Sequence, residues 1–152
     1  MLRRFTSLLL FSLLLCAGFL AAAPAQEASA ATYTVTNSNS DGAGSLRQAI
    51  LDANSHPGRD YIHFAIPTSD PGYSSALGVW FIRLTLTLPM LEDSDGVVID
   101  GATQPGSNPN LPGIIIQHTG VPVGVPIITM WSSNNIVEYL GLFSSAGDGV
   151  KI

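Results

Sequence analysis

The chain is poor in cysteine and in charged side chains. Of its 152 residues, one is cysteine, six are Lys or Arg and eleven are Asp or Glu. The cysteine, Cys16, lies in the apolar amino-terminal segment, so no disulfide can stabilise the rest of the chain and a packed core must do so. The few basic residues argue against nucleic-acid binding, which depends on clustered Lys and Arg.

The amino-terminal segment has the three zones of a secretory signal peptide. Arg3 and Arg4 are followed by an apolar stretch from Phe5 to Leu20 and then by small residues. The apolar stretch is shorter than the ~20 residues that a transmembrane helix needs. We therefore expect residues 1–25 to be a signal peptide, with no membrane span after its removal and a secreted or cell-surface location.

Two sites fit the small-x-small rule for signal cleavage, Ala23-Pro24-Ala25 and Ala28-Ser29-Ala30. The first lies at the more usual distance from the apolar core, so the expected cleavage is before Gln26, and a start at Ala31 is the alternative. Removal of residues 1–25 takes two of the six basic residues and none of the eleven acidic ones, which leaves a net charge of −7.

The mature sequence predicts one all-β domain with a single helix. It has few charges and many turn-forming residues, including 15 Gly and 10 Pro in the whole chain. Ser45 is a suitable N-cap for a helix over about residues 45–54, whose apolar positions follow helical spacing. Strands are predicted around Tyr33–Val35, Ile62–Ile66, Trp80–Leu88, Val97–Ile99, Ile114–Ile116, Pro126–Met130, Ile136–Leu142 and Val150–Ile152.

The later strands recur at intervals that leave two architectures open. Ile99, Ile128 and Val150 are separated by 29 and 22 residues, and Ile115 and Leu140 lie 25 apart. Intervals of this size are typical of a coiled solenoid in which each turn contributes more than one strand. A β-sandwich gives short strands at a similar spacing.

Three segments resemble one protein family. They are TYTVTNSNSDGAGSLRQAILDANSHPGRDYIHFAIP (Thr32–Pro67), VVIDGATQPG (Val97–Gly106) and VEYLGLFSSAGDGVKI (Val137–Ile152). Together they resemble exported bacterial right-handed parallel β-helix proteins, which are pectin-lyase-like and carry a CSLREA-type amino-terminal motif. Here the motif is GSLRQAI, with Gly44 at the family's cysteine and Gln48 at its glutamate.

The resemblance implies a right-handed parallel β-helix with its helix as an amino-terminal cap. Residues 26–95 would form the cap and residues 96–152 the first turns of the β-helix, incomplete at the carboxyl end. An open end exposes strand edges and an apolar cross-section. We therefore expect self-association through the carboxyl end.

Several ionisable residues are candidates for a functional site, and each also has a structural interpretation. Glu92, Asp93 and Asp95 form the densest acidic cluster, which favours a solvated turn over a calcium site because the EF-hand register is absent. Asp100 and Asp148 each precede a glycine, a pattern typical of turns, although paired carboxylates can also hydrolyse glycosides.

The other candidate side chains are scattered. The basic residues Arg47, Arg59, Arg83 and Lys151 form no cluster, and the histidines show no metal-binding spacing; they are His56, His63 and His118. Among the aromatic residues Tyr73, Trp80, Trp131 and Tyr139, Trp131 is the best candidate for a ligand contact and Trp80 fits a core strand. The pair Asn134 and Asn135 is expected to adopt left-handed backbone and to stack on Asn in a neighbouring turn.

The sequence thus assigns no catalytic, cofactor-binding or metal-binding residue. The predicted function is a non-enzymatic exported or cell-surface module that acts as a scaffold or adhesive surface, with a carbohydrate or cell-surface polymer as partner. The alternative is the amino-terminal fragment of a polysaccharide lyase or glycoside hydrolase of the pectin-lyase-like fold.

Overall fold

The computed structural model describes residues 29–144 and 147–152. The predicted signal peptide, residues 1–25, and the cleavage site after Ala25 lie outside the described residues. The described elements, in chain order, are β1 (Thr32–Val35), α2 (Leu46–Ser55), β2 (Asp60–Phe64), β3 (Tyr73–Ser74), β4 (Val79–Leu84), β5 (Val97–Asp100), the 3-10 helix η1 (Gly101–Thr103), β6 (Ile114–His118), β7 (Ile128–Thr129), β8 (Ile136–Glu138), β9 (Leu140–Phe143) and β10 (Val150–Lys151).

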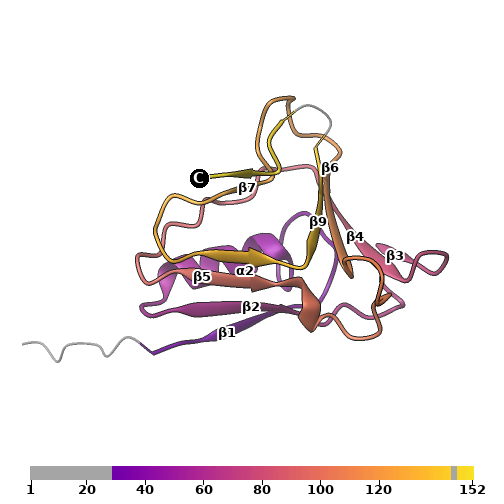
Figure 1. Ribbon diagram of the computed structural model, residues 1–152, viewed down its shortest axis with the longest axis horizontal. Helices are drawn as coiled ribbons and strands as arrows, with labels where there is room; N and C mark the ends of the chain where they lie inside the picture. The colour runs from indigo at the N-terminus through magenta and orange to yellow at the C-terminus, as the bar shows by residue number, and fades with distance from the viewer. Residues whose placement is uncertain (1–28, 145–146) are drawn as a thin grey trace, which may run out of the picture.

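The strands form three small sheets around a common interior (Figure 1). The first sheet has the order β1-β2-β5-β8, and all its strands are parallel. The second has the order β3-β4-β6-β9, in which β3 is antiparallel to β4. The third consists of β7 and β10, and a parallel bridge between Leu91 and Met130 lies next to it.

The predicted helix is present as α2, which lies behind β5 in the view of Figure 1. The Ser45 side chain accepts a hydrogen bond from the backbone N–H of Gln48 at 3.2 Å, which satisfies an otherwise unpaired group in the first turn. The buried face consists of the four positions that helical spacing predicts, Leu46, Ala49, Ile50 and Ala53. Burial of each large side chain contributes roughly 1.5–3 kcal/mol relative to exposure.

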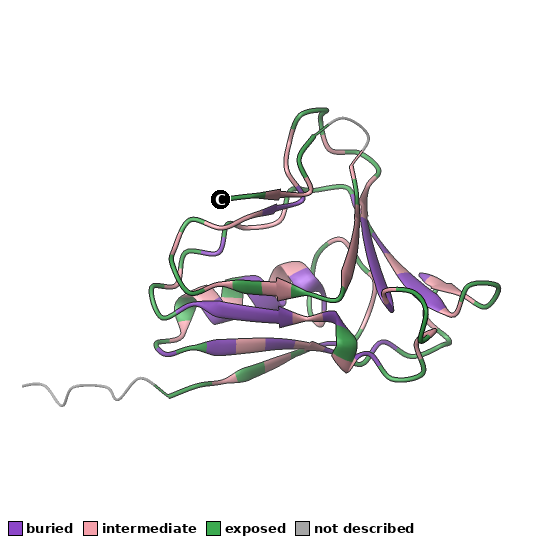
Figure 2. Cartoon of the chain, viewed as in Figure 1, coloured by how far each residue is buried: buried purple, intermediate pink, exposed green. Residues whose placement is uncertain are grey.

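The core is built from rows of apolar side chains in register on adjacent strands. Ile99 pairs with Ile62 on one side and with Val137 on the other. Trp80 begins a second row, is fully buried, and donates its indole N–H to the Pro67 carbonyl at 3.0 Å. Figure 2 shows the buried positions concentrated on β2, β5 and the inner faces of β4 and β6.

The predicted right-handed parallel β-helix of the pectin-lyase-like class is wrong. The described residues form ten short strands in three small sheets, and the antiparallel β3 makes the second sheet mixed. Most strands are separated by connections that contain Gly, Pro or Ser, and the strands are two to six residues long. The predicted repeat is right for Ile128, which pairs with Val150. It is wrong for Ile99, which pairs with Ile62 and Val137, and it is one residue out for Leu140, which pairs with Ile114.

The two longest predicted strands are shortened or divided in the structure. The strand that begins near Trp80 stops at Leu84, and Leu86 is 47% exposed instead of continuing the core face. The run from Ile136 to Leu142 divides into β8 and β9 at Tyr139, whose φ of 54° is left-handed. This one residue turns the chain from the first sheet into the second.

Candidate functional site

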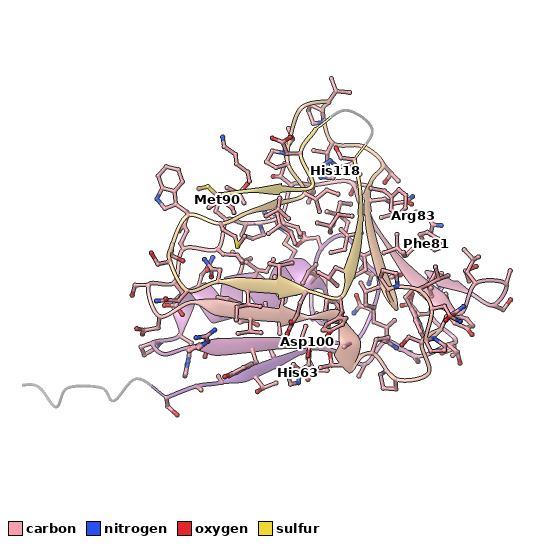
Figure 3. All side chains as sticks on the ribbon, viewed as in Figure 1. His63, Phe81, Arg83, Met90, Asp100 and His118 are labelled. Carbon is pink, nitrogen blue, oxygen red and sulfur yellow. The ribbon has the colours of Figure 1, made fainter. Side chains whose placement is uncertain are left out.

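The outer face of the first sheet brings ionisable side chains from three strands into one row. Side chains alternate between the two faces of a strand, and those of His63, Asp100 and Glu138 fall on the outer one. Asp100 pairs in register with Glu138, and His63 follows Ile62, the partner of Ile99. Figure 3 shows His63 and Asp100 at the same end of this sheet.

Two carboxylates of this row, those of Asp100 and Glu138, lie on adjacent strands. The two residues are directly opposite each other, so their carboxyl groups lie on one face, and glycosidases also use a pair of carboxyl groups. However, Asp100 already accepts the Ala102 backbone N–H at 2.8 Å and caps η1. At least one oxygen of the pair therefore holds a turn, as the turn interpretation of Asp100-Gly101 predicts.

Glu138 was missed at the sequence level. The alternation within Ile136–Glu138 indicates that Glu138 shares a face with Ile136. Its position beside Asp100 depends on the length of the connection between β5 and β8, which hydrophobic spacing does not specify.

The outer face of the second sheet carries a cation held over an aromatic ring. The Arg83 guanidinium lies 5.1 Å from the centroid of the Phe81 ring, a cation–π distance (Figure 3). Arg83 is in register with Gln117, which is in register with Phe143, and Phe143 is 62% exposed. Within the described residues no carboxylate lies within 4.0 Å of Arg83. Strand pairing brings these four side chains together, and hydrophobic alternation alone does not indicate it.

A groove of about 570 Å³ lies between α2 and the segment after β4. The amide of Asn54 joins its two walls by donating to the Met90 carbonyl at 2.7 Å and accepting the Glu92 backbone N–H at 3.0 Å. Arg47 also donates to the Thr87 carbonyl. The polar side chains of the groove thus fasten the segment to the helix.

The predicted acidic cluster holds the turn before β5. Asp95 accepts the Gly58 backbone N–H at 3.0 Å, and Asp93 accepts the Asp95 N–H at 3.1 Å. Glu92 lies at the groove instead, with an exposed side chain. In the part of the chain that the structure describes, no group of three or more His, Cys, Asp or Glu side chains could hold a metal ion.

Asp148 and Asp100, the two predicted Asp-Gly positions, lie on different sheets. Asp100 ends β5 of the first sheet, while Asp148 precedes β10 of the third and is exposed. The basic residues are also dispersed, one each on α2, before β2, on β4 and on β10: Arg47, Arg59, Arg83 and Lys151.

The three histidines have separate environments. His56 faces Asp60, with Nδ1 3.2 Å from Oδ1, and His63 lies on the outer face of the first sheet. His118 pairs with the fully buried Leu84, and its Nε2 is buried with no hydrogen-bond partner among the described residues. Burial lowers the pKa of His118 below its ordinary 6.5.

The predicted aromatic candidates divide between core and surface. Tyr73 is half-buried and packs on the fully buried Trp80 with ring centroids 4.7 Å apart, so the Trp80 ring is part of the core. Trp131 is 76% exposed and Tyr139 is 65% exposed. Trp131 therefore stays accessible, as the ligand-contact hypothesis requires.

The asparagine pair is structural, but it makes different contacts from those predicted. Asn134 has the predicted left-handed backbone, with φ of 66°, and lies against Gly96. Asn135 accepts the Val97 backbone N–H at 2.9 Å and donates to the Ser132 carbonyl at 2.8 Å. The expected stacking on another Asn is wrong, because Gly96 and Val97 occupy the neighbouring positions.

Comparison with known proteins identifies no relative. No protein-family model matches the chain, and neither does any curated protein or solved structure. The family resemblance of the three segments therefore stays a prediction. In the described residues no helix combines the length and the apolar character needed to cross a membrane.

Proposed function

We propose that this protein is a non-enzymatic module, exported from the cytoplasm, that serves as a scaffold or adhesive surface for a carbohydrate or other cell-surface polymer. One observation carries the proposal: several polar side chains of the described residues are bonded to backbone groups of neighbouring turns. Asp95 accepts from Gly58, Thr103 from Phe64, Gln104 from Ile66 and Asn135 from Val97. These side chains stabilise the stacking of successive segments.

The outer faces of the sheets support the adhesive part of the proposal. Parallel strands use their backbone groups in the ladder, so each face presents side chains only. The first sheet offers Tyr61 and His63, with ring centroids 6.2 Å apart, and the second offers Phe81 and Phe143. Accessible aromatic rings provide contact area at a low entropy cost, which suits a binding surface.

Export is supported by composition and by the amino-terminal sequence. Arg3 and Arg4, the apolar stretch and two small-x-small sites are the signals that a secretory pathway recognises. The acidic and cysteine-free mature sequence suits a protein that works at a surface without a disulfide framework.

A glycoside hydrolase is the second candidate, and the pairing of Asp100 with Glu138 favours it. In that function one carboxyl group would protonate the leaving oxygen and the other would attack the sugar. The hydrogen bond from Ala102 to Asp100 counts against this role because it commits one carboxylate to a turn.

Retention on polymers tests the proposed function. The mature protein is mixed with insoluble polysaccharides and with bacterial envelopes, and the bound fraction is measured by sedimentation. If the first sheet binds the polymer, Tyr61→Ala should reduce retention several-fold. If the second sheet binds the polymer, Phe143→Ala should reduce it several-fold. Leu77→Ala, at a residue 46% exposed in the β3–β4 hairpin, is the control and should not change it. Equal retention of all variants, or none by the unmodified protein, would contradict the adhesive proposal.

A further inference from the structure

Asp60 is a fully buried carboxylate at the start of β2. Its Oδ1 accepts the Ala31 backbone N–H at 2.7 Å and lies 3.2 Å from the His56 Nδ1. Its Oδ2 is also buried and has no hydrogen-bond partner in the described part of the chain. Within the described residues, Oδ1 of Asp60 therefore has two polar neighbours and Oδ2 has no hydrogen-bond partner.

A buried carboxylate needs a compensating positive charge and donors for both oxygens. The Ala31 peptide N–H supplies one donor and no net charge. His56 supplies charge only when it is protonated, and its side chain is 34% exposed. A donor with more hydrogens and a positive charge at neutral pH would complete the site.

The next strands of the same sheet show what a neutral donor requires. Ala31, Asp60, Val97 and Asn135 occupy equivalent register positions on successive strands. Between Asn135 and Val97, the neutral amide of Asn135 accepts the Val97 N–H at 2.9 Å, and its Nδ2 donates to the Ser132 carbonyl. An amide side chain thus satisfies a peptide N–H at this position. Asp60 has a charged carboxylate at the same position, where a neutral amide would be enough for a peptide N–H. We therefore expect its donor to carry a positive charge.

The position of Ala31 coincides with a processing motif. Ser29 and Ala30 are exposed, whereas Ala31 is half-buried and its carbonyl accepts the Tyr61 N–H at 2.9 Å. The small-x-small sequence Ala28-Ser29-Ala30 ends at the residue before it. The sheet therefore begins where cleavage at the second predicted site would leave a new amino terminus.

We propose that a signal-processing protease cleaves after Ala30 and that the α-ammonium of Ala31 forms an ion pair with Asp60. Hydrolysis breaks the Ala30–Ala31 peptide bond. Water supplies OH to the Ala30 carbonyl and H to the Ala31 nitrogen, and a proton then passes from the new carboxylic acid to the amine. An α-amino group is mostly protonated at pH 7, given its ordinary pKa of about 7.7–8.0. Its three N–H groups can serve both Oδ1 and Oδ2 of Asp60.

This inference rests on the proposed export and replaces the expected start at Gln26. A start at Gln26 would retain Ser29, whose backbone lies close against Gly58. That contact gives the competing start a structural basis, so the amino terminus has to be measured.

Mass spectrometry of the exported chain gives the first test. A mass beginning at Ala31 is the expected result. A mass beginning at Gln26 would overturn the ion pair and leave export intact, whereas an intact chain beginning at Met1 would overturn both.

Thermal unfolding of the chain that starts at Ala31 gives the second test. The chain is prepared with a free α-amine and with the α-amine acetylated enzymatically, which restores an amide N–H and leaves Lys151 unmodified. We expect the free amine to raise Tm by several degrees. The difference should disappear in Asp60→Asn and persist in Asp52→Asn, a half-buried control on α2. Equal Tm values for the free and acetylated chains would overturn the proposal, and this comparison stands even where Asp60→Asn fails to fold.

Discussion

Gln104 is bonded to Ile66 through both ends of its side-chain amide. Its Oε1 accepts the Ile66 N–H and its Nε2 donates to the Ile66 carbonyl, each at 2.9 Å. Gln104 is 3% exposed, so water cannot replace either bond. This pair joins the turn after β5 to the chain leaving β2.

Removal of that amide should destabilise the fold strongly. Gln104→Ala loses two hydrogen bonds and leaves a buried N–H and C=O of Ile66 unpaired, a cost of about 2–4 kcal/mol. Gln117→Ala, at a half-buried position on β6, is the matched control and should cost under about 1 kcal/mol. Urea denaturation measures both, and similar midpoints for the two variants would contradict the buried role of Gln104.

The apolar face of α2 gives a second prediction. Ile50 is fully buried, so Ile50→Asp places a charge in the core and should cost at least about 3 kcal/mol. Gln48→Ala removes only a hydrogen bond to Asp52, worth roughly 0.2–0.5 kcal/mol on a helix surface. Thermal melts of both variants test this, and equal tolerance would show that the face is not buried.

Gly101 lies where the turn after β5 closely approaches the chain between β8 and β9. A Cβ at Gly101 would collide with the Tyr139 carbonyl oxygen and with Leu140, so Gly101→Ala should shift backbone and destabilise the protein. At Gly120 a Cβ would make ordinary contacts of 3.5 Å or more, and Gly120→Ala should be tolerated. The two melting temperatures check the prediction, which fails if Gly101→Ala melts at the wild-type temperature.

His118 should make stability sensitive to mild acid. Burial lowers its pKa in the folded state, so the unfolded chain binds a proton at higher pH than the folded one. The contribution of neutral His118 to the free energy of unfolding is fully present above about pH 6.5. It is lost as the pH falls through the lower pKa of His118 in the folded state. We expect the unfolding free energy of the wild type to fall more between pH 7 and 5 than that of His118→Leu. Parallel pH profiles for the two proteins would contradict this.

Local structure was predictable where a short pattern determines it. Ser45 and the four apolar positions of α2 lie within a few residues of one another, and the structure confirms both the cap and the buried face. The core role of Trp80 followed from alternation with its neighbours in the same way.

Long-range arrangement was only partly predictable from those patterns. The pairing of Ile99 with Val137, and of Asp100 with Glu138, depends on connection lengths between strands. The predicted repeat joined Ile128 to Val150 correctly. It also joined Ile99 to Ile128, which do not pair, and the predicted fold class was wrong. The buried polar contacts of Asp60 and Gln104 were missed for the same reason, since their partners are 29 and 38 residues away.

We propose that Asp100 holds the turn after β5 and that the carboxylates of the first sheet perform no reaction. Turnover of polysaccharides tests it most directly: the mature protein is incubated with pectate, pectin and neutral glycans, with and without calcium, and reducing and unsaturated ends are measured. We predict no release above that of the Asp100→Asn and Glu138→Gln variants. Release by the wild type that disappears in either variant, while that variant keeps its wild-type melt, would contradict the account.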